Sequence, residues 1–250
     1  MKFKDHFSGH AAQYAKYRPA YPAELSDFLA AACPDRELAW DCGAGNGQFA
    51  VDLARVFAKV YATDASSEQI ANAIGPANVV YSVAPAERSG LPSQCADLIT
   101  VAQALHWFDI DAFMQEARRV LKQGGIMAAW CYELFTCEPA VDAIVRHFFT
   151  EVVGPFWPPE RALVEQHYRN IAFPFEEIAS EPFAMQAVWN LTDLIGYMNT
   201  WSATKRYREA KGSDPVPELM RSLEEAWGSP AAQRPIHWPL HLRVGRQLES

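Results

Sequence analysis

The sequence has little positive charge, few cysteines and no long apolar run. Its 250 residues include 22 Lys and Arg against 30 Asp and Glu, a formal net charge of −8. A surface without a basic field disfavours polyanionic partners, so no nucleic acid is expected. The five cysteines form no C-x-x-C pair, which predicts reduced thiols in the cytoplasm. The apolar stretch 141–149 is interrupted by Asp142 and Arg146, so neither a membrane span nor an export signal is expected.

Short apolar runs alternate with helical patterns between residues 37 and 130. This alternation predicts an α/β fold with a doubly wound, mostly parallel sheet. A helix is expected to end at Leu121, with Lys122 in a basic last turn and a glycine stop at 124–125. The predicted strands are 37–40, 59–63, 79–83, 97–102 and 125–130.

Two regions lie outside this alternation. Residues 1–36 predict a short helix and an extended turn, with Tyr14, Tyr17, Arg18 and Tyr21 in an aromatic and basic cluster. The Pro- and Trp-rich region from Glu138 onward predicts a strand at 182–189, helices at 191–201 and 216–227, and a final strand within 236–244. The chain is therefore divided into an N-terminal lid, 1–36, a core, 37–137, and a roof insertion with the final strands, 138–250.

The most informative segment is the glycine-rich loop 40–47, Trp-Asp-Cys-Gly-Ala-Gly-Asn-Gly, after the first predicted strand. Glycines in this place let the backbone approach a ligand at the carboxyl end of the sheet, and the following helix offers free amides to an anion. The spacing is G-x-G-x-G, and Gln48 occupies the place of the third glycine of the dinucleotide fingerprint. The alternative is a tight turn between strand and helix.

Three further segments follow predicted strands. Asp64, at the tip of the second strand, can accept hydrogen bonds from ribose hydroxyls, or it can cap a helix. Ala86 and Glu87 can reach an adenine edge, or they can form a polar turn. Residues 103–108, Gln-Ala-Leu-His-Trp-Phe, would face a reacting group, where the Trp107 ring suits a sulfonium; alternatively Trp107 and Phe108 are core residues.

With these four segments in this order, the sequence resembles the class I S-adenosylmethionine-dependent methyltransferases. It is more narrowly similar to the small-molecule branch that includes trans-aconitate methyltransferases. The resemblance implies a Rossmann-like sheet of seven strands with the last one antiparallel. It also implies S-adenosyl-L-methionine as the cofactor, S-adenosyl-L-homocysteine as its product, and a lid and a roof over the site. Methyltransferases that act on nucleic acid amines carry a different motif where this chain has Gln103-Ala104-Leu105-His106.

The resemblance and the loop positions together predict the site residues. For the substrate we expect Tyr21, Trp130, Trp201 and Arg206. The expected cofactor-binding residues are Tyr14, Arg18, Asp41, Gly43, Ala44, Gly45, Gly47, Asp64, Ala65, Gln69, Ala86, Glu87, Gln103, Ala104 and Trp107.

The sequence leaves the catalytic chemistry open. His106 is the candidate general base for a hydroxyl or amine substrate, and its alternative is a packed or cofactor-contacting residue. For an acidic substrate, the basic run 205–208 supplies a counter-charge or is a solvated helix face. The pairs His6/His10 and His237/His241 have no third ligand nearby, so no metal is expected.

The roof concentrates aromatic residues and suggests the substrate. Trp157, Trp189, Trp201, Tyr197 and Tyr207 predict either an apolar pocket wall or a second small core. We expect a small-molecule methyltransferase without membrane attachment, as a monomer or homodimer. The other two functions considered are a non-catalytic cofactor-binding regulator and a nicotinamide-dependent oxidoreductase.

Overall fold

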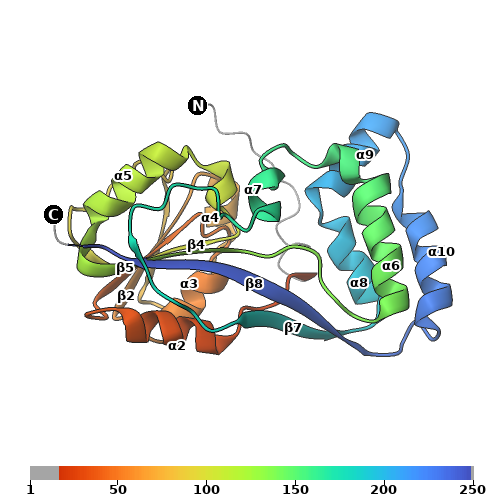
Figure 1. Ribbon diagram of the computed structural model, residues 1–250, viewed down its shortest axis with the longest axis horizontal. Coiled ribbons are helices and arrows are strands. Elements are labelled where there is room, and N and C mark those ends of the chain that lie inside the picture. The colour runs from red at the N-terminus through yellow and green to blue at the C-terminus, as the bar shows by residue number, and fades with distance from the viewer. Residues whose placement is uncertain (1–16, 249–250) are drawn as a thin grey trace.

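The computed structural model describes residues 17–248. It forms a twisted sheet with helices on both faces, and a layer of helices stands beyond one end of the sheet (Figure 1). The described part of the chain contains no helix long and apolar enough to cross a membrane. The expected aromatic and basic cluster of the lid falls partly outside the described residues, since Tyr14 precedes them.

Eight strands build the sheet. Seven follow the order β3-β2-β1-β4-β5-β8-β6, and β7 pairs with β8 off this path. The first five are mutually parallel, whereas β8 runs antiparallel to β5, β6 and β7. This confirms the expected α/β class and the antiparallel last strand. The strands are β1 Leu38–Cys42, β2 Lys59–Asp64, β3 Val79–Val83, β4 Ala96–Ala102, β5 Leu121–Cys131, β6 Glu176–Glu177, β7 Phe183–Trp189 and β8 Arg234–Arg246.

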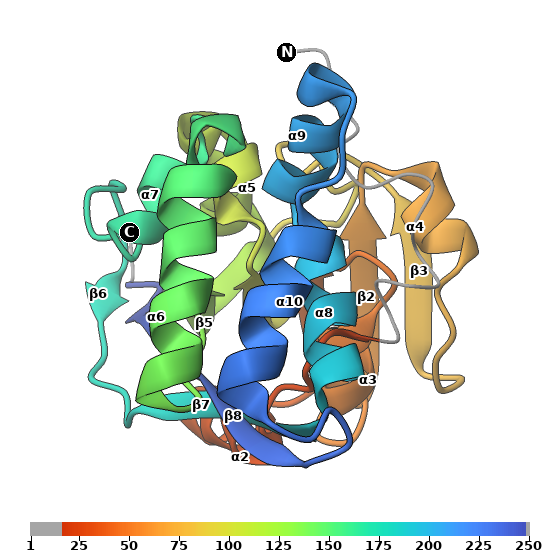
Figure 2. The ribbon, with the colours of Figure 1, turned by 90° about the vertical axis from the view of Figure 1, so that its right-hand side faces the viewer.

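Helices cover the two faces of the sheet and form the roof. Leu29 and Phe49 pack from α2 and α3 on one face, and Phe113 packs from α5 on the other. The roof helices α6, α8 and α10 stand side by side, with α9 above them (Figure 2). The helices are α2 Ala23–Ala32, α3 Gln48–Leu53, α4 Ser67–Ala71, α5 Ile110–Val120, α6 Pro139–His147, α7 Arg161–Glu165, α8 Leu191–Asn199, α9 Ser202–Lys211 and α10 Val216–Trp227.

Strand alternation explains the two faces. Along β1, Ala39 joins the hydrophobic cluster under α2 and α3, while its neighbour Trp40 joins the cluster under α5. The first cluster continues into the roof, where it includes Trp227 and Trp238. Sheet and roof therefore share one core. The division of the chain into a core and a roof at 137/138 stays a prediction.

One expected boundary is wrong. The helix α5 ends at Val120, and β5 begins at Leu121 without a glycine stop. Gly124 has φ +73° inside an irregular part of the β4–β5 pairing, where the register shifts between Ala96 and Leu98. Lys122 lies in this strand and pairs with Glu37 and the buried Asp97, each at 2.8 Å. Lys122 therefore neutralises two carboxylates at the amino ends of the parallel strands. The sequence pattern predicts it in the last turn of a helix instead.

Candidate functional site

The glycine-rich loop lies at the carboxyl end of β1, between β2 and β4. Gly43, Gly45 and Gly47 all have left-handed φ angles, of +69°, +57° and +87°. The Asp64 carboxylate ties the loop to β2, because its Oδ2 accepts the Gly45 amide at 2.9 Å and its Oδ1 accepts the Ser66 amide at 2.8 Å. Asp64 therefore holds the loop and the start of α4 at the tip of β2.

Two of the glycines are also required for space. An ideal Cβ on Gly43 would lie 2.7 Å from the Cβ of Ala104, which follows β4. An ideal Cβ on Gly47 would lie 2.3 Å from the Tyr81 hydroxyl of β3. The loop therefore packs directly against segments of two other strands, and a side chain at either position would push them apart.

Asp41 is a buried carboxyl at the tip of β1. Its Oδ1 accepts the Thr100 hydroxyl at 2.7 Å, and its Oδ2 is buried without a hydrogen-bond partner among the described residues. Burial raises the pKa of Asp41 to about 7. An orphaned carboxylate oxygen beside a glycine loop fits an ammonium group, and S-adenosylmethionine presents one at its methionine end. The residues at this end of the sheet therefore fit the expected cofactor.

The other predicted cofactor contacts surround the same loop. Ala86 is buried, and Glu87 accepts the Asp109 amide at 2.9 Å, which ties its loop to the start of α5. Gln69 is buried near the loop, and its side-chain oxygen lies 3.8 Å from an ideal Cβ on Gly45. Ala65, the next residue after Asp64, is half-buried.

The segment after β4 joins the cofactor side to the roof. Gln103 has φ +54°, and its side-chain amide makes two hydrogen bonds, of 2.9 and 3.0 Å, with the backbone of Tyr132. His106 is buried, and its Nδ1 lies 2.8 Å from the Tyr168 hydroxyl. Burial, with a smaller contribution from the charge of Arg161, lowers the pKa of His106 to about 3. The imidazole is therefore neutral at physiological pH.

A cavity of about 80 Å³ lies between this segment and the roof. The segment after β4 contributes Gln103, His106 and Trp107 to its wall, and Arg18 comes from the N-terminal region. Of the aromatic residues expected in a pocket wall, Trp157, Tyr197 and Trp201 line it. The remaining lining residues are Tyr132, Glu133, Leu134, Phe149, Pro158, Arg161, Thr200 and Ser202.

Other expected substrate residues lie elsewhere. Trp130 is fully buried, and its ring packs against Tyr21 and Phe49, at centroid distances of 5.5 and 4.7 Å. Tyr21 packs against the same Phe49 ring. Arg206 is half-buried on α9 and is not part of the cavity wall.

Trp201 combines the two roles that the sequence offered as alternatives. It lines the cavity, yet only 5 % of its surface is exposed. Its ring lies 5.7 to 5.9 Å from the rings of Phe149, Trp157 and Tyr197. The roof core and the cavity wall are therefore built from the same side chains.

One group of metal-ligand residue types occurs among residues 17–248. It consists of Glu133, His167 and His241, so His241 meets partners that its spacing from His237 did not suggest. The two imidazoles are stacked, with centroids 3.5 Å apart and planes 7° from parallel, and His167 Nε2 lies 3.2 Å from Glu133. Lone pairs in parallel planes do not converge on one ion, so the group as it stands is an imidazole–carboxylate contact with a ring stack.

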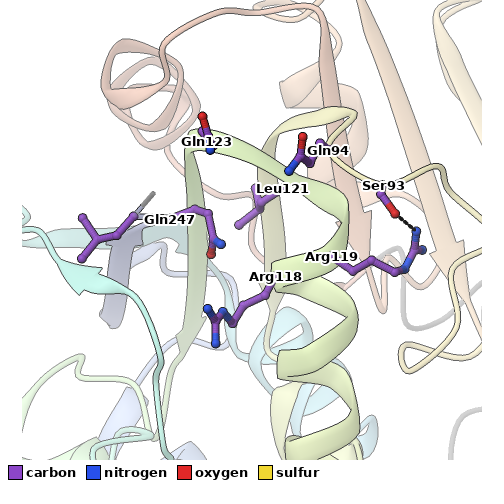
Figure 3. Close-up of a pocket in the computed structure, with 8 residues that line it drawn as sticks. Ser93, Gln94, Arg118, Arg119, Leu121, Gln123 and Gln247 are labelled. Carbon is purple, nitrogen blue, oxygen red and sulfur yellow. Dashed lines mark hydrogen bonds between the residues drawn. The ribbon is translucent and has the colours of Figure 1, made fainter. Parts of the chain in front are cut away.

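A second cavity, of about 310 Å³, lies away from the glycine loop (Figure 3). Gln94 precedes β4 and Leu121 begins β5, so this cavity is at the amino ends of the parallel strands. In its wall, Arg119 is bonded to Ser93 and Glu116. Ligands of doubly wound sheets bind at the opposite, carboxyl end. We therefore place the functional site at the smaller cavity.

Sequence reasoning missed the residue with the most distinctive environment in the cavity, Arg161. It is the first residue of α7, after Pro158, Pro159 and Glu160. No motif marks it, because its position depends on how the roof folds back over the segment after β4. A lone arginine after a Pro-Pro pair in a Trp-rich region was the only available signal.

Comparisons with known proteins identify the family of the chain. The sequence model of a family described as "Methyltransferase domain" matches residues 40–129. A Dictyostelium discoideum protein named as a methyltransferase is 36% identical over 230 residues, 90% of this chain and 88% of the other.

Solved structures of methyltransferases share the fold of this chain. A protein from Anaeromyxobacter dehalogenans, described as a type II methyltransferase, is 40% identical with a TM-score of 0.88, covering 94% of this chain and 100% of that one. A Bacillus halodurans structure described as a methyltransferase shares the fold at 19% identity and a TM-score of 0.52, covering 91% of this chain and 100% of that one.

Proposed function

Because the chain belongs to the class I S-adenosylmethionine-dependent methyltransferases, we propose that it methylates a small organic molecule held in the 80 Å³ cavity. The observation that carries this proposal is the composition of the cavity wall. Gln103, His106 and Trp107 come from the segment after β4, and the roof supplies the facing aromatic side chains. A substrate there would lie between the cofactor end of the sheet and the roof.

For the cofactor we propose the residues that surround the glycine loop. Asp64 would accept the ribose hydroxyls, Asp41 would face the ammonium group, and Ala86 and Glu87 would lie at the adenine edge. The rest of the proposed set is Tyr14, Arg18, Gly43, Ala44, Gly45, Gly47, Ala65, Gln69, Gln103, Ala104 and Trp107.

The bound cofactor supplies a methyl group already activated by its positive sulfonium. The protein therefore has to position the acceptor atom in line with that methyl group and to exclude water. The buried aromatic rings of the roof exclude water, and the paired hydrogen bonds between Gln103 and Tyr132 fix the segment after β4. Neither task needs a proton to move.

His106 is better suited to positioning than to general base catalysis. A base is most effective when its pKa lies near the working pH, whereas the pKa of His106 is lowered to about 3. Its Nδ1 is already paired with the Tyr168 hydroxyl at 2.8 Å. We propose that the His106–Tyr168 pair holds the cavity wall in place.

The size of the cavity and the net charge of the chain both restrict the substrate. A volume of about 80 Å³ is below the roughly 300–1,000 Å³ of typical small-molecule sites, so a ring-sized substrate must displace part of the wall. The net charge of −8 gives no field to hold a nucleic acid. A small molecule is the substrate class that fits both.

Calorimetry with S-adenosylmethionine tests the cofactor part of the proposal. Asp64→Ala should weaken binding by about 1.5 to 3 kcal/mol, because hydrogen bonds to a charged acceptor are lost. Glu176→Ala, in the exposed strand β6, is the matched acidic control and should bind like the wild type. Equal affinity of the folded Asp64→Ala variant would remove Asp64 from the site.

A radiolabelled methyl-transfer screen of small acids, phenols and amines tests the activity. Transfer to any member of the panel supports the proposal. Tight cofactor binding without transfer to any compound would favour a non-catalytic regulator. Thermal stabilisation by NAD but not by S-adenosylhomocysteine would favour an oxidoreductase.

A further inference from the structure

Arg161 places a positive charge in the cavity wall without a matching negative charge. Its guanidinium lies over two rings, 4.2 Å from the centroid of Trp157 and 5.0 Å from that of Phe149. Its Nε is buried without a hydrogen-bond partner in the described chain. None of the ion pairs found between residues 17 and 248 includes Arg161.

Another stacked arginine shows what a structural role looks like in this protein. Arg243 lies 4.4 Å from the Phe173 centroid, and its guanidinium also donates to the carbonyls of Tyr168 and Ile171 and pairs with Glu177. The face of the Arg243 guanidinium thus contacts a ring, and its N–H groups along the edge are hydrogen-bonded or ion-paired. Arg161 has the ring contacts but not the edge contacts.

The acidic residues near Arg161 do not neutralise it. Glu133 and Glu165 favour its charge from a distance, but neither forms an ion pair with it among the described residues. Burial is the main effect on Arg161 and lowers its pKa. A buried cation in the wall of a cavity, with one N–H group unsatisfied, is costly unless a ligand pairs with its charge.

We infer that Arg161 is a carboxylate-recognition residue, and that the substrate is a small carboxylic acid with a planar apolar body. This inference rests on the proposed function. The planar fork of a guanidinium matches the two oxygens of a carboxylate, and rings that hold its faces leave that fork directed along the edge. Trp157 and Trp201 supply apolar surfaces for the body of the acid.

A second polar group in the wall suits the same ligand. The Tyr132 hydroxyl accepts a hydrogen bond from Arg18 Nη1 at 2.8 Å, which leaves its own proton available to donate. Arg18 adds positive charge and lies 5.2 Å from the Tyr197 centroid. An anion in the cavity therefore meets two guanidinium groups and a hydroxyl donor.

Matched pairs of acids and amides test the inference. The probes are benzoate with benzamide, cinnamate with cinnamamide and indole-3-acetate with indole-3-acetamide, titrated into protein saturated with S-adenosylhomocysteine. Within at least one pair, the wild type should bind the acid roughly 10- to 100-fold more tightly than the amide. Equal binding within every pair would overturn the inference.

Three variants locate the preference. Arg161→Gln should abolish the acid preference and keep the wild-type affinity for S-adenosylhomocysteine, whereas Arg161→Lys should keep only part of the preference because it lacks the fork. Arg146→Gln, at an exposed position of α6, is the control and should behave like the wild type. An Arg161→Gln variant that still prefers acids would assign the selectivity to another residue and overturn the inference.

Stability separates recognition from packing. Arg161→Met keeps the contact with the rings and removes the unpaired charge, so it should unfold at a urea concentration no lower than that of the wild type. A lower midpoint together with an unchanged acid preference would make Arg161 a structural residue. If the protein methylates neutral acceptors and shows no acid preference, this inference fails while the proposed function stands.

Discussion

The cofactor side and the roof of this protein are specified in different ways. At the carboxyl end of the sheet, single residues meet conformational requirements, such as the left-handed φ of Gly47 or the position of Asp64 at a strand tip. The roof residues that line the cavity have no such requirement. Trp157 meets Trp201 through packing between segments that are far apart in sequence. Local requirements can be recognised in a sequence, whereas packing partners become visible only in the fold.

The largest expected effect tests how much of the stability depends on packing in the roof. Trp201→Ala should lower the free energy of unfolding by about 3 to 5 kcal/mol, because a nearly buried indole surrounded by four aromatic rings leaves a large cavity. Urea denaturation measures this loss. Trp201→Phe is the matched variant and should retain most of the stability.

The same variant also probes the boundary between the two regions. The folded fraction of Trp201→Ala should bind S-adenosylmethionine like the wild type and lose methyl transfer. A large loss of cofactor affinity in folded protein would show that roof and cofactor side cannot be separated.

The second test compares two glycines that share a left-handed conformation. Gly47→Ala should cost about 2 to 4 kcal/mol of stability, because the new Cβ adds a clash with the Tyr81 hydroxyl to the backbone strain. Gly75 also lies near this hydroxyl, since an ideal Cβ there would be 2.6 Å from it.

Gly212 is the control for that substitution. It ends α9 with φ +64° and has nothing within 4 Å of an ideal Cβ, so Gly212→Ala should cost only about 1 kcal/mol. Urea titrations of both variants measure the difference. Equal costs would show that strain alone, without crowding, fixes the glycine loop.

The third test is the pH dependence that Asp41 gives to the cofactor side. The pKa of Asp41 is raised to about 7 in the folded protein, so between its unfolded value of about 4 and pH 7 the folded state holds the extra proton. This contribution to stability therefore falls as the pH rises through that window, in the absence of cofactor. His106 contributes with the opposite sign, because burial lowers its pKa to about 3, below its unfolded value of about 6.5. The difference between the wild type and Asp41→Asn therefore isolates the Asp41 contribution.

Cofactor binding should show the opposite trend. An ammonium group favours the ionised carboxylate, so the affinity for S-adenosylmethionine should rise roughly tenfold between pH 5.5 and 7. Asp41→Asn should bind more weakly and without this dependence. Calorimetry across the pH range measures both, and a flat wild-type profile would place Asp41 away from the ammonium group.

The sequence predicted the sheet well because its strands are short apolar runs closed by turns. It placed Val79–Val83 without error and found α10 at its observed bounds. It missed α6 and gave a helix face over 205–208, within α9, only as an alternative, since these patterns adjoin Pro- and Trp-rich segments that resemble loops. The end of α5 was wrong because Lys122 and two glycines imitate a helix terminus, while the strand pairing decides the structure.

The candidate site divides along the same line. The glycine loop and Asp64 could be predicted because backbone geometry restricts which residues can stand there. Arg161 could not be predicted, because only the described structure shows that its guanidinium contacts two rings while its Nε has no hydrogen-bond partner. The predicted counter-charge at Arg206 lies on a helix face outside the cavity wall, while Arg161 lines it.

The strand β8 has a consequence for how the protein is made. Residues 234–240 pair with β7, and residues 241–246 pair with β5, more than a hundred positions earlier in the chain. Synthesis proceeds from the amino end, so β5 leaves the ribosome with one edge open and waits for most of the remaining chain to appear. Such distant pairing slows folding, and the exposed edge is a place for misassociation until β8 arrives. A chaperone that covers β5 during synthesis would therefore raise the yield of folded protein more than one that acts after release.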